Sequence, residues 1–492
     1  MKTLIAIGML QALAIVASVV RLKVISIGLG PIGLGLVGTI DQLLQAVAQL
    51  SALSLPLNAL KFMARAHSKG HREFNDSYAG FFRALLLLSV AGTVVAVTVI
   101  SLRPDVLSAD RRLSTGLLVV ALLNVPTTSL GLLLTNVFAA AHRSVAAAAL
   151  QFGLAATLAV AAVIGVTSGG IAAVYAISLG LSVALVLIVI AYLRRRMHLS
   201  LLEVRHSVLT ELRQHPGVVR SSVAAYVSLS AVAVALLAPR YAVLGYQGAE
   251  QAGYFQAVLS TALALGAVLN AMTGQYLLPL LNRNLPLSEK FRAIDEFQIR
   301  QLLLFGLAAL PVAMLPDIVL QILFSGRFQQ ASPWLAPLIG WQLLILQGGL
   351  MQQILFSLDD VVMLMMLTCA GYGAAAALGF AWVPGFGVNG VIAGLIIGAL
   401  AMLGAFYLRL RSAHGLSISP RALAITAYII VGLVIARALV GETGLQYPLA
   451  ARVMTALVLM AGLWFFVPAQ EKASLAAYLR PARRPAVNEQ SV

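Results

Sequence analysis

The amino-acid sequence predicts an all-α polytopic membrane protein that crosses the bilayer about fourteen times. Of its 492 residues, 60% are hydrophobic and only 10% are charged, and its mean hydropathy is +0.94. A soluble domain usually has about 25% charged residues, so this chain cannot cover a water-facing surface. Apolar runs recur along its whole length, each near the roughly 20 residues that cross about 30 Å of hydrocarbon. Because lipid-exposed backbone must bond to itself, these runs are expected to be helices.

Fourteen apolar runs are expected to span the membrane. In chain order they occupy residues 4–26, 33–60, 81–102, 114–140, 145–166, 170–193, 218–244, 252–281, 300–325, 334–357, 361–382, 388–410, 420–440 and 448–468. The first run, preceded by Lys2, has features of both a cleavable signal and a signal anchor. The apolar character resumes directly after it, which favours the anchor.

The basic residues predict the orientation of the chain. The net charge of +16 would suggest a nucleic-acid partner in a soluble protein. Here the Lys and Arg residues gather in alternate loops, including 65–72, 194–213 and 472–484. Short loops rich in Lys and Arg remain on the cytoplasmic side. We therefore expect both termini in the cytoplasm and no nucleic-acid partner.

Short patterns recur in the two halves of the chain, in the same order and about 210 to 220 residues apart. The three pairs are Pro104-Asp105 with Pro316-Asp317, Leu29-Gly30 with Leu244-Gly245, and Gly169-Gly170 with Gly387-Val388. An even number of crossings in each unit gives both copies the same orientation. The repeats therefore predict two pseudo-symmetric six-helix lobes around a central cavity, an arrangement found in many transporters.

The repeats also predict how the chain is divided. We expect an N-terminal lobe at 1–196 and a C-terminal lobe at 217–412. The basic stretch at 197–216 is expected to be a cytoplasmic linker lying on the membrane surface, against anionic lipid or a partner. Two further helices fall within 413–470, and a cytoplasmic tail follows at 471–492.

Polar side chains inside the spans are the candidate site residues. They either join helices through hydrogen bonds worth about 0.6 kcal/mol each or line a water-filled cavity. The candidates for the central cavity are Arg21, Lys23, Asp41, Gln45, Gln49, Asn124, Arg240, Gln256, Asn270 and Gln342.

The charges among these candidates favour an anionic passenger. Three cations, Arg21, Lys23 and Arg240, stand against Asp41 alone. Arg21 and Lys23 could also snorkel to the outer interface or pair with Asp41. If they remain unneutralised, a positive cavity suits a phosphate or pyrophosphate.

Other chemistry finds little support in the sequence. Cys369 is the single cysteine, so one chain cannot form a disulfide framework or a cysteine-based metal site. No Walker or metalloprotease motif is present. We expect no catalytic residues, no metal and no cofactor. An ion gradient, of H⁺ or Na⁺, the membrane potential or the passenger's own gradient is expected to drive any transport.

Three segments resemble one known family. They are Leu29-Gly30-Pro31-Ile32-Gly33-Leu34, Ile322-Leu323-Phe324-Ser325-Gly326-Arg327-Phe328 and Val383-Pro384-Gly385-Phe386-Gly387-Val388-Asn389-Gly390. Together with the hydropathy they resemble the polysaccharide flippases, or O-antigen translocases, of the multidrug/oligosaccharidyl-lipid/polysaccharide (MOP) exporter superfamily. The family often has a basic residue directly before its Leu-Gly-Pro, where this chain has Ser26-Ile27-Gly28.

The resemblance implies a flippase in the bacterial cytoplasmic membrane. It would move a polyprenyl-pyrophosphate-linked oligosaccharide to the outer leaflet by alternating access. Arg21, Lys23 and Arg240 would meet the pyrophosphate or acidic sugars, and the Gln and Asn residues would meet hydroxyls. The expected partners are this lipid-linked oligosaccharide, the bilayer, a polysaccharide polymerase and other assembly proteins.

Three alternatives remain at this stage. A drug/cation antiporter of the same superfamily would prefer carboxylates in its cavity, for which Asp41 is the strong candidate. A lipid II flippase would share the cationic cavity. A membrane glycosyltransferase or polymerase would need a large outer loop with catalytic groups, and the expected outer loops are short.

Overall fold

Three helices are about twice as long as one membrane crossing requires, and each reverses at a glycine. They are α1 (Lys2–Ala52), α10 (Pro216–Met272) and α15 (Val361–His414). Helical geometry is lost at Gly30, Gly248 and Gly387, where φ is 65°, 85° and 57°, a region that glycine enters without a steric penalty. Residues 21 and 41 would lie about 30 Å apart on a straight helix, yet their side chains form a 2.6 Å ion pair. α1 is therefore two antiparallel crossings.

The structure is a computed structural model that describes residues 2–102, 113–201, 216–273, 277, 281, 286–358, 360–416, 419–441, 447–467 and 472. Its other elements are α2 (Leu55–Lys69), α3 (His71–Leu102), α5 (Thr115–Leu122), α6 (Val125–Ala140), α7 (Ser144–Ser168), α8 (Gly170–Met197), α12 (Leu287–Met314), α13 (Pro316–Leu323), η2 (Gly326–Ala331), α14 (Ser332–Ser357), α16 (Pro420–Val440), α17 (Leu449–Leu463) and η3 (Trp464–Phe466). Eleven helices in the described part are long and apolar enough to cross a membrane. Three of them are double, which gives 11 + 3 = 14 crossings, as the sequence predicts.

Two expected spans differ from the structure. The run at 300–325 was expected to be one crossing, but α12 ends at Met314 and the separate helix α13 begins at Pro316, where proline cannot continue the helix. The run at 33–60 was expected to be one crossing, but the helix ends at Ala52, and Leu53 and Ser54 have φ of 47° and 56°. Pro56 then lies in the first turn of α2, where its missing N–H costs nothing. Hydropathy could not separate the two helices, because α2 turns its own apolar face inward and leaves its charged face outside.

The turn glycines repeat between the two halves. Gly30 corresponds to Gly248 at an offset of 248 − 30 = 218 residues, and Gly170 corresponds to Gly387 at 387 − 170 = 217. All four have positive φ and join consecutive crossings. The pairing of Leu29-Gly30 with Leu244-Gly245 was therefore wrong by three residues, and that of Gly169-Gly170 with Gly387-Val388 identified the right turns but was wrong by one residue. The Pro104-Asp105 copy lies outside the described residues.

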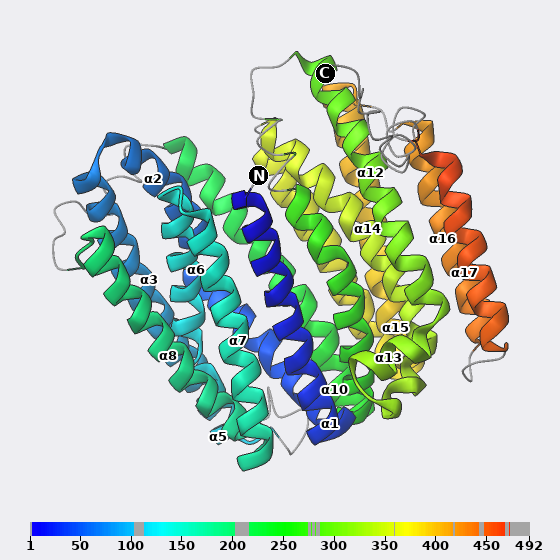
Figure 1. Ribbon diagram of the computed structural model, residues 1–492, viewed down its shortest axis with the longest axis horizontal. Coiled ribbons are helices and arrows are strands. Elements are labelled where there is room, and N and C mark those ends of the chain that lie inside the picture. Colours follow the sequence, from blue (N-terminus) through cyan, green and yellow to red (C-terminus); the bar gives the residue numbers. More distant parts are fainter. Residues whose placement is uncertain are drawn as a thin grey trace, which may run out of the picture.

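The hydrophobic cores show where the two lobes meet. One large core combines residues 25–48 and 100–175 with residues 242–463, so both halves of the chain share it. A second core draws only on residues 52–199, and a third only on residues 277–416. The lobes are thus packed together at the end that carries the turns at Gly30 and Gly248, here called the closed end. They separate toward the opposite end, the open end, where α6 is followed by α7 (Figure 1). His142 lies in the turn between these two helices.

The remaining segments lie around these lobes. α16 and α17 pack against α12, on the side away from α3 and α8 (Figure 1). At the start of the expected linker, the Ser200 N–H donates to Asn75 Oδ1 over 2.6 Å, and Arg83 donates to the Leu201 carbonyl. The rest of the linker, 202–215, and the expected tail apart from Lys472 lie outside the described residues.

Candidate functional site

Two adjoining cavities lie between the lobes. The first, about 610 Å³, is lined from α1, α7 and α10 and includes Arg21 and Arg240; we call it the arginine chamber. The second, about 600 Å³, is lined from α1, α2, α6 and α10 and is rich in amides and hydroxyls; we call it the amide chamber. Gln42, Gln45 and Leu236 line both, so the two chambers are continuous.

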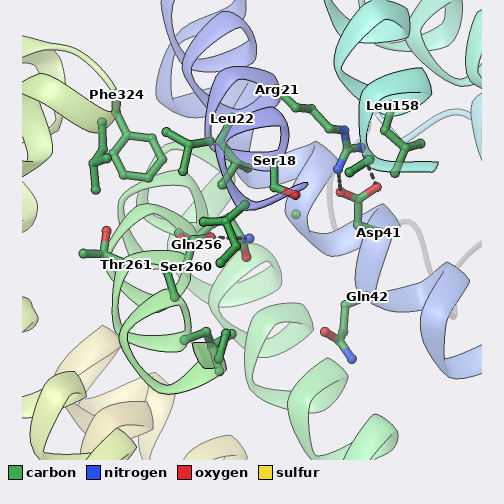
Figure 2. Close-up of a pocket in the computed structure, with 18 of the residues that line it drawn as sticks. Ser18, Arg21, Leu22, Asp41, Gln42, Leu158, Gln256, Ser260, Thr261 and Phe324 are labelled. Atoms are coloured by element: carbon green, nitrogen blue, oxygen red, sulfur yellow. Dashed lines mark hydrogen bonds and ion pairs between the residues drawn. The ribbon is translucent and has the colours of Figure 1, made fainter. Parts of the chain in front are cut away.

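Both carboxylate oxygens of Asp41 have a partner in the arginine chamber. Arg21 Nη1 and Nη2 donate to them over 2.6 and 3.0 Å (Figure 2). The Tyr175 hydroxyl also donates to Oδ1 over 2.8 Å. A two-point arginine–carboxylate pair has fixed geometry and is among the stronger ion pairs. This confirms the alternative in which Arg21 pairs with Asp41. Tyr175, on α8, completes the group and was missed, because one Tyr in an apolar run carries no distinguishing signal.

Arg240 has no such counterion. It lies on the first limb of α10 and is 6% exposed. Its Nε donates to Gln256 Oε1 over 2.9 Å, its Nη1 donates to the Leu236 carbonyl over 3.2 Å and to Gln42 Oε1, and Nη2 has no partner in the described part of the chain. No described carboxylate lies within ion-pair distance of it.

The position of Arg240 is costly for the fold. A buried charge without an opposite charge carries a desolvation penalty of several kcal/mol. Such charges inside a membrane protein usually mark a substrate or ion path. Gln42 on α1 and Arg240 on α10 also form a hydrogen bond from one lobe to the other. Gln42 was not among the expected site residues, although it directly follows Asp41 and precedes Gln45, which were.

Lys23 lies outside both chambers, contrary to expectation. Its Nζ donates to the carbonyls of Gln321 and Ile322 over 3.0 and 2.5 Å. These carbonyls belong to the last turn of α13, where the helix leaves them unbonded and the dipole favours a cation. Lys23 therefore ties the N-terminal lobe to α13 at the closed end.

Three further candidates do not line either chamber. Asn124 Nδ2 donates to the Ala121 and Tyr175 carbonyls over 3.2 Å each, which ties the break between α5 and α6 to α8. Gln342 is buried on α14 against Gly266. Asn270 is exposed and lies beside Gly349 of α14. Helical spacing groups residues on one face, but how each helix is rotated in the bundle decides where that face points.

The expected candidates that do line the chambers are Arg21, Asp41, Gln45, Gln49, Arg240 and Gln256.

The chambers end where the lobes touch. The second limbs of α1 and α10 approach so closely that a Cβ at Gly253 would overlap the carbonyl oxygen of Pro31. Beside them, Phe328 packs against Phe324 in a tilted arrangement and against Tyr254 edge to face, with ring centroids 5.4 and 5.9 Å apart. Close glycine contacts and buried aromatic rings leave no room for solvent, so this end is sealed.

A further ion pair holds α13 from the other side. Arg452 on α17 donates to the Asp317 carboxylate over 2.7 and 3.3 Å, and the two side chains are 3% and 13% exposed. Arg452 was not among the expected site residues. It was overlooked because a single Arg in the last span resembles an interfacial anchor.

Comparison with solved structures identifies proteins that share this fold. No family model matches the sequence, and no curated protein sequence matches it either. Among solved structures, the lipid II flippase MurJ in an inward closed conformation has a TM-score of 0.69 at 11% identity, covering 96% of this chain and 99% of that one. An inward-facing multidrug resistance MATE family transporter of the MOP superfamily has a TM-score of 0.63 at 16% identity, covering 85% and 96%. The MATE multidrug transporter DinF-BH has a TM-score of 0.59 at 16% identity, covering 83% and 93%.

These structural neighbours are transporters and a flippase, not enzymes. At such low identity the likeness defines architecture and leaves the passenger open. The chain is a polytopic membrane protein with the fold of the MOP superfamily transporters.

Proposed function

We propose that this protein is a flippase for a polyprenyl-pyrophosphate-linked oligosaccharide, with Arg240 as the residue that binds the pyrophosphate. The open end would face the cytoplasm of a bacterial inner membrane, and both termini would lie on that side. The observation that carries the proposal is a buried guanidinium between the lobes that has amide and carbonyl partners only. A pyrophosphate oxygen at Nη2 would supply the missing negative charge through a charge-assisted hydrogen bond.

The closed end supports an alternating-access cycle. The contacts that seal it, between Gly253 and Pro31 and between Lys23 and α13, join the two lobes. Opening that end would require these contacts to break while new ones form at the open end. Since the sequence has no Walker motif, we propose that a gradient of H⁺ or Na⁺, or the membrane potential, drives the cycle. A polysaccharide polymerase and other assembly proteins would then receive the passenger.

A drug/cation antiporter is the second candidate, and the geometry speaks against it. Such a protein needs a carboxylate that is free to meet a cation. Asp41 is the one carboxylate among the described lining residues of the two chambers, and Arg21 and Tyr175 already occupy its oxygens. Arg240 adds a positive charge nearby that would repel a cationic drug.

The test compares passengers in vesicles of purified protein. A polyprenyl-pyrophosphate-linked oligosaccharide with a fluorescent sugar and the organic cation ethidium would each be followed across the bilayer. We expect protein-dependent transfer of the lipid-linked sugar and none of ethidium. Transfer of ethidium without transfer of the lipid-linked sugar would overturn the proposal in favour of the antiporter.

A further inference from the structure

We infer that the amide chamber holds the sugar headgroup and accepts only uncharged sugars. This inference rests on the proposed function, since it assumes that the passenger carries a pyrophosphate that binds Arg240. It deepens that proposal by naming the class of headgroup. The juxtaposition that carries it is an amide-lined hollow, without charge among its described residues, directly beside a buried arginine that has no described ion-pair partner.

The walls of the amide chamber contain no charge among the described residues. Their polar groups are amides and hydroxyls, and the rest are aliphatic side chains and one proline. The polar members are Gln42, Gln45, Gln49, Ser54, Thr128, Ser129 and Asn136. Amides and hydroxyls both donate and accept, which is the pattern that complements sugar hydroxyls and N-acetyl groups.

Several of these groups have unused hydrogen-bonding capacity. Ser129 is 4% exposed, and its hydroxyl has no partner in the described structure. Asn136 Nδ2 donates to the Pro56 carbonyl over 2.8 Å, which leaves its Oδ1 available. Gln45 and Gln49 make no side-chain hydrogen bond to any described residue. A buried polar group without a partner costs about 1–3 kcal/mol, which applies to Ser129, while Gln45, Gln49 and Asn136 are less buried and present free donors or acceptors to the chamber. Such a wall is suited to a polar ligand.

The two chambers are in the right order for such a passenger. Gln42 accepts from Arg240 and lines both chambers, and Gln45 lines both as well. From Arg240 the amide chamber continues toward α2 and Pro56, which lie at the open end. A lipid with its pyrophosphate at Arg240 would therefore place the attached sugar against Gln45 and Gln49, where it enters from the open end.

The absence of charge from the described walls gives selectivity. A carboxylate or ammonium group on the headgroup would lose water without gaining a counterion, and this costs several kcal/mol. Arg21 offers no compensation, because Asp41 already neutralises it. Uronic acids, amino sugars with a free amine and peptide-bearing headgroups should therefore bind poorly, whereas neutral hexoses and N-acetylhexosamines should bind well.

The experiment uses three matched probes and the full chain in lipid nanodiscs. The first probe is a polyprenyl pyrophosphate bearing two N-acetylglucosamine residues, the second bears glucuronic acid as the outer sugar, and the third has no sugar. We expect the neutral probe to bind at least tenfold more tightly than the acidic one. In Gln49→Lys, and independently in Asn136→Lys, this preference should shift at least tenfold toward the acidic probe.

The outcomes separate the two claims. Equal or tighter binding of the acidic probe by the unsubstituted protein would overturn the neutral-sugar inference. If the sugar-free probe still bound through Arg240, the proposed function would stand. Failure of all three probes to bind would instead overturn the proposed function. The ratio of two probes on one variant is insensitive to partial misfolding, because loss of folded protein reduces both signals equally.

Discussion

Arg21 and Asp41 lie on opposite sides of the turn at Gly30 and meet through contacts of 2.6 and 3.0 Å. The pair fixes the two limbs of α1 against each other, and Tyr175 joins α8 to the same carboxylate over 2.8 Å. Asp41 therefore organises the N-terminal lobe at the edge of the arginine chamber. Because both of its oxygens already accept from Arg21 or Tyr175, a drug cation would have to compete with these partners for Asp41.

Replacing one partner of this ion pair should destabilise the protein more than replacing both partners together. Asp41→Asn leaves Arg21 without its counterion, and loss of one partner from a buried pair costs about 3–5 kcal/mol. Because Asp41 is partly exposed to the chamber, we expect the lower part of that range. The double variant Arg21→Gln/Asp41→Asn should recover most of the loss. Thermal unfolding of the purified protein measures both.

Transport by the same variants separates structure from ion coupling. If Asp41 is a structural partner, the double variant should regain transport as well as stability. A stable, folded double variant with no transport would instead assign Asp41 to a coupling ion.

The seal at the closed end should depend on the size of residue 253. In Gly253→Ala the added Cβ overlaps the Pro31 carbonyl, so the sealed state is disfavoured. The reporter is Ser260→Cys, which lies in the arginine chamber, in a Cys369→Ala background. A membrane-impermeant maleimide added at the closed end should label this cysteine at least several times faster when Gly253→Ala is also present. Gly180→Ala, where a Cβ meets nothing within 4 Å, is the matched control. Unchanged labelling would show that this contact is not part of the seal.

Arg452→Gln should be strongly destabilising. Arg452 and Asp317 are 3% and 13% exposed, so the substitution leaves a largely buried carboxylate unpaired, at a cost of about 3–5 kcal/mol. Arg292→Gln removes a pair with 83% and 51% exposed side chains and should cost under about 1 kcal/mol. Equal unfolding temperatures for the two variants would contradict this assignment.

The orientation of the chain should follow the basic loops. His142 is exposed at the open end and Ser168 at the closed end. In the Cys369→Ala background, an impermeant maleimide should label His142→Cys only from the cytoplasmic side. It should label Ser168→Cys only from the outer side. The reverse pattern would place the open end outside.

The sequence was sufficient to predict the fold class, because a bilayer restricts a lipid-exposed chain to helices of known length. It also predicted the repeat, since turn glycines such as Gly170 and Gly387 must adopt a conformation that other residues avoid. It did not predict the break at Leu53, where apolar character continues across two helices of different orientation.

The site was predictable only in part, for a similar reason. Composition identified Arg240 and Asp41 as unusual residues, and helical spacing placed Gln45 and Gln49 on one face. Spacing cannot report how helices rotate against one another. For that reason Lys23, Asn124 and Gln342 were assigned to a cavity although they join elements. The group in which Arg21 and Tyr175 both bond to Asp41 joins residues far apart in the sequence, so only the three-dimensional structure reveals it.

The most direct test of the central claim is the affinity of Arg240→Gln for polyprenyl pyrophosphate, measured together with its unfolding temperature. Removing a buried charge without a counterion should leave the unfolding temperature unchanged or raise it. The lost charge-assisted hydrogen bond is worth about 1.5–3 kcal/mol, which corresponds to a loss of affinity of about 10- to 150-fold. A stable Arg240→Gln variant that binds polyprenyl pyrophosphate as tightly as the unsubstituted protein would contradict the proposal.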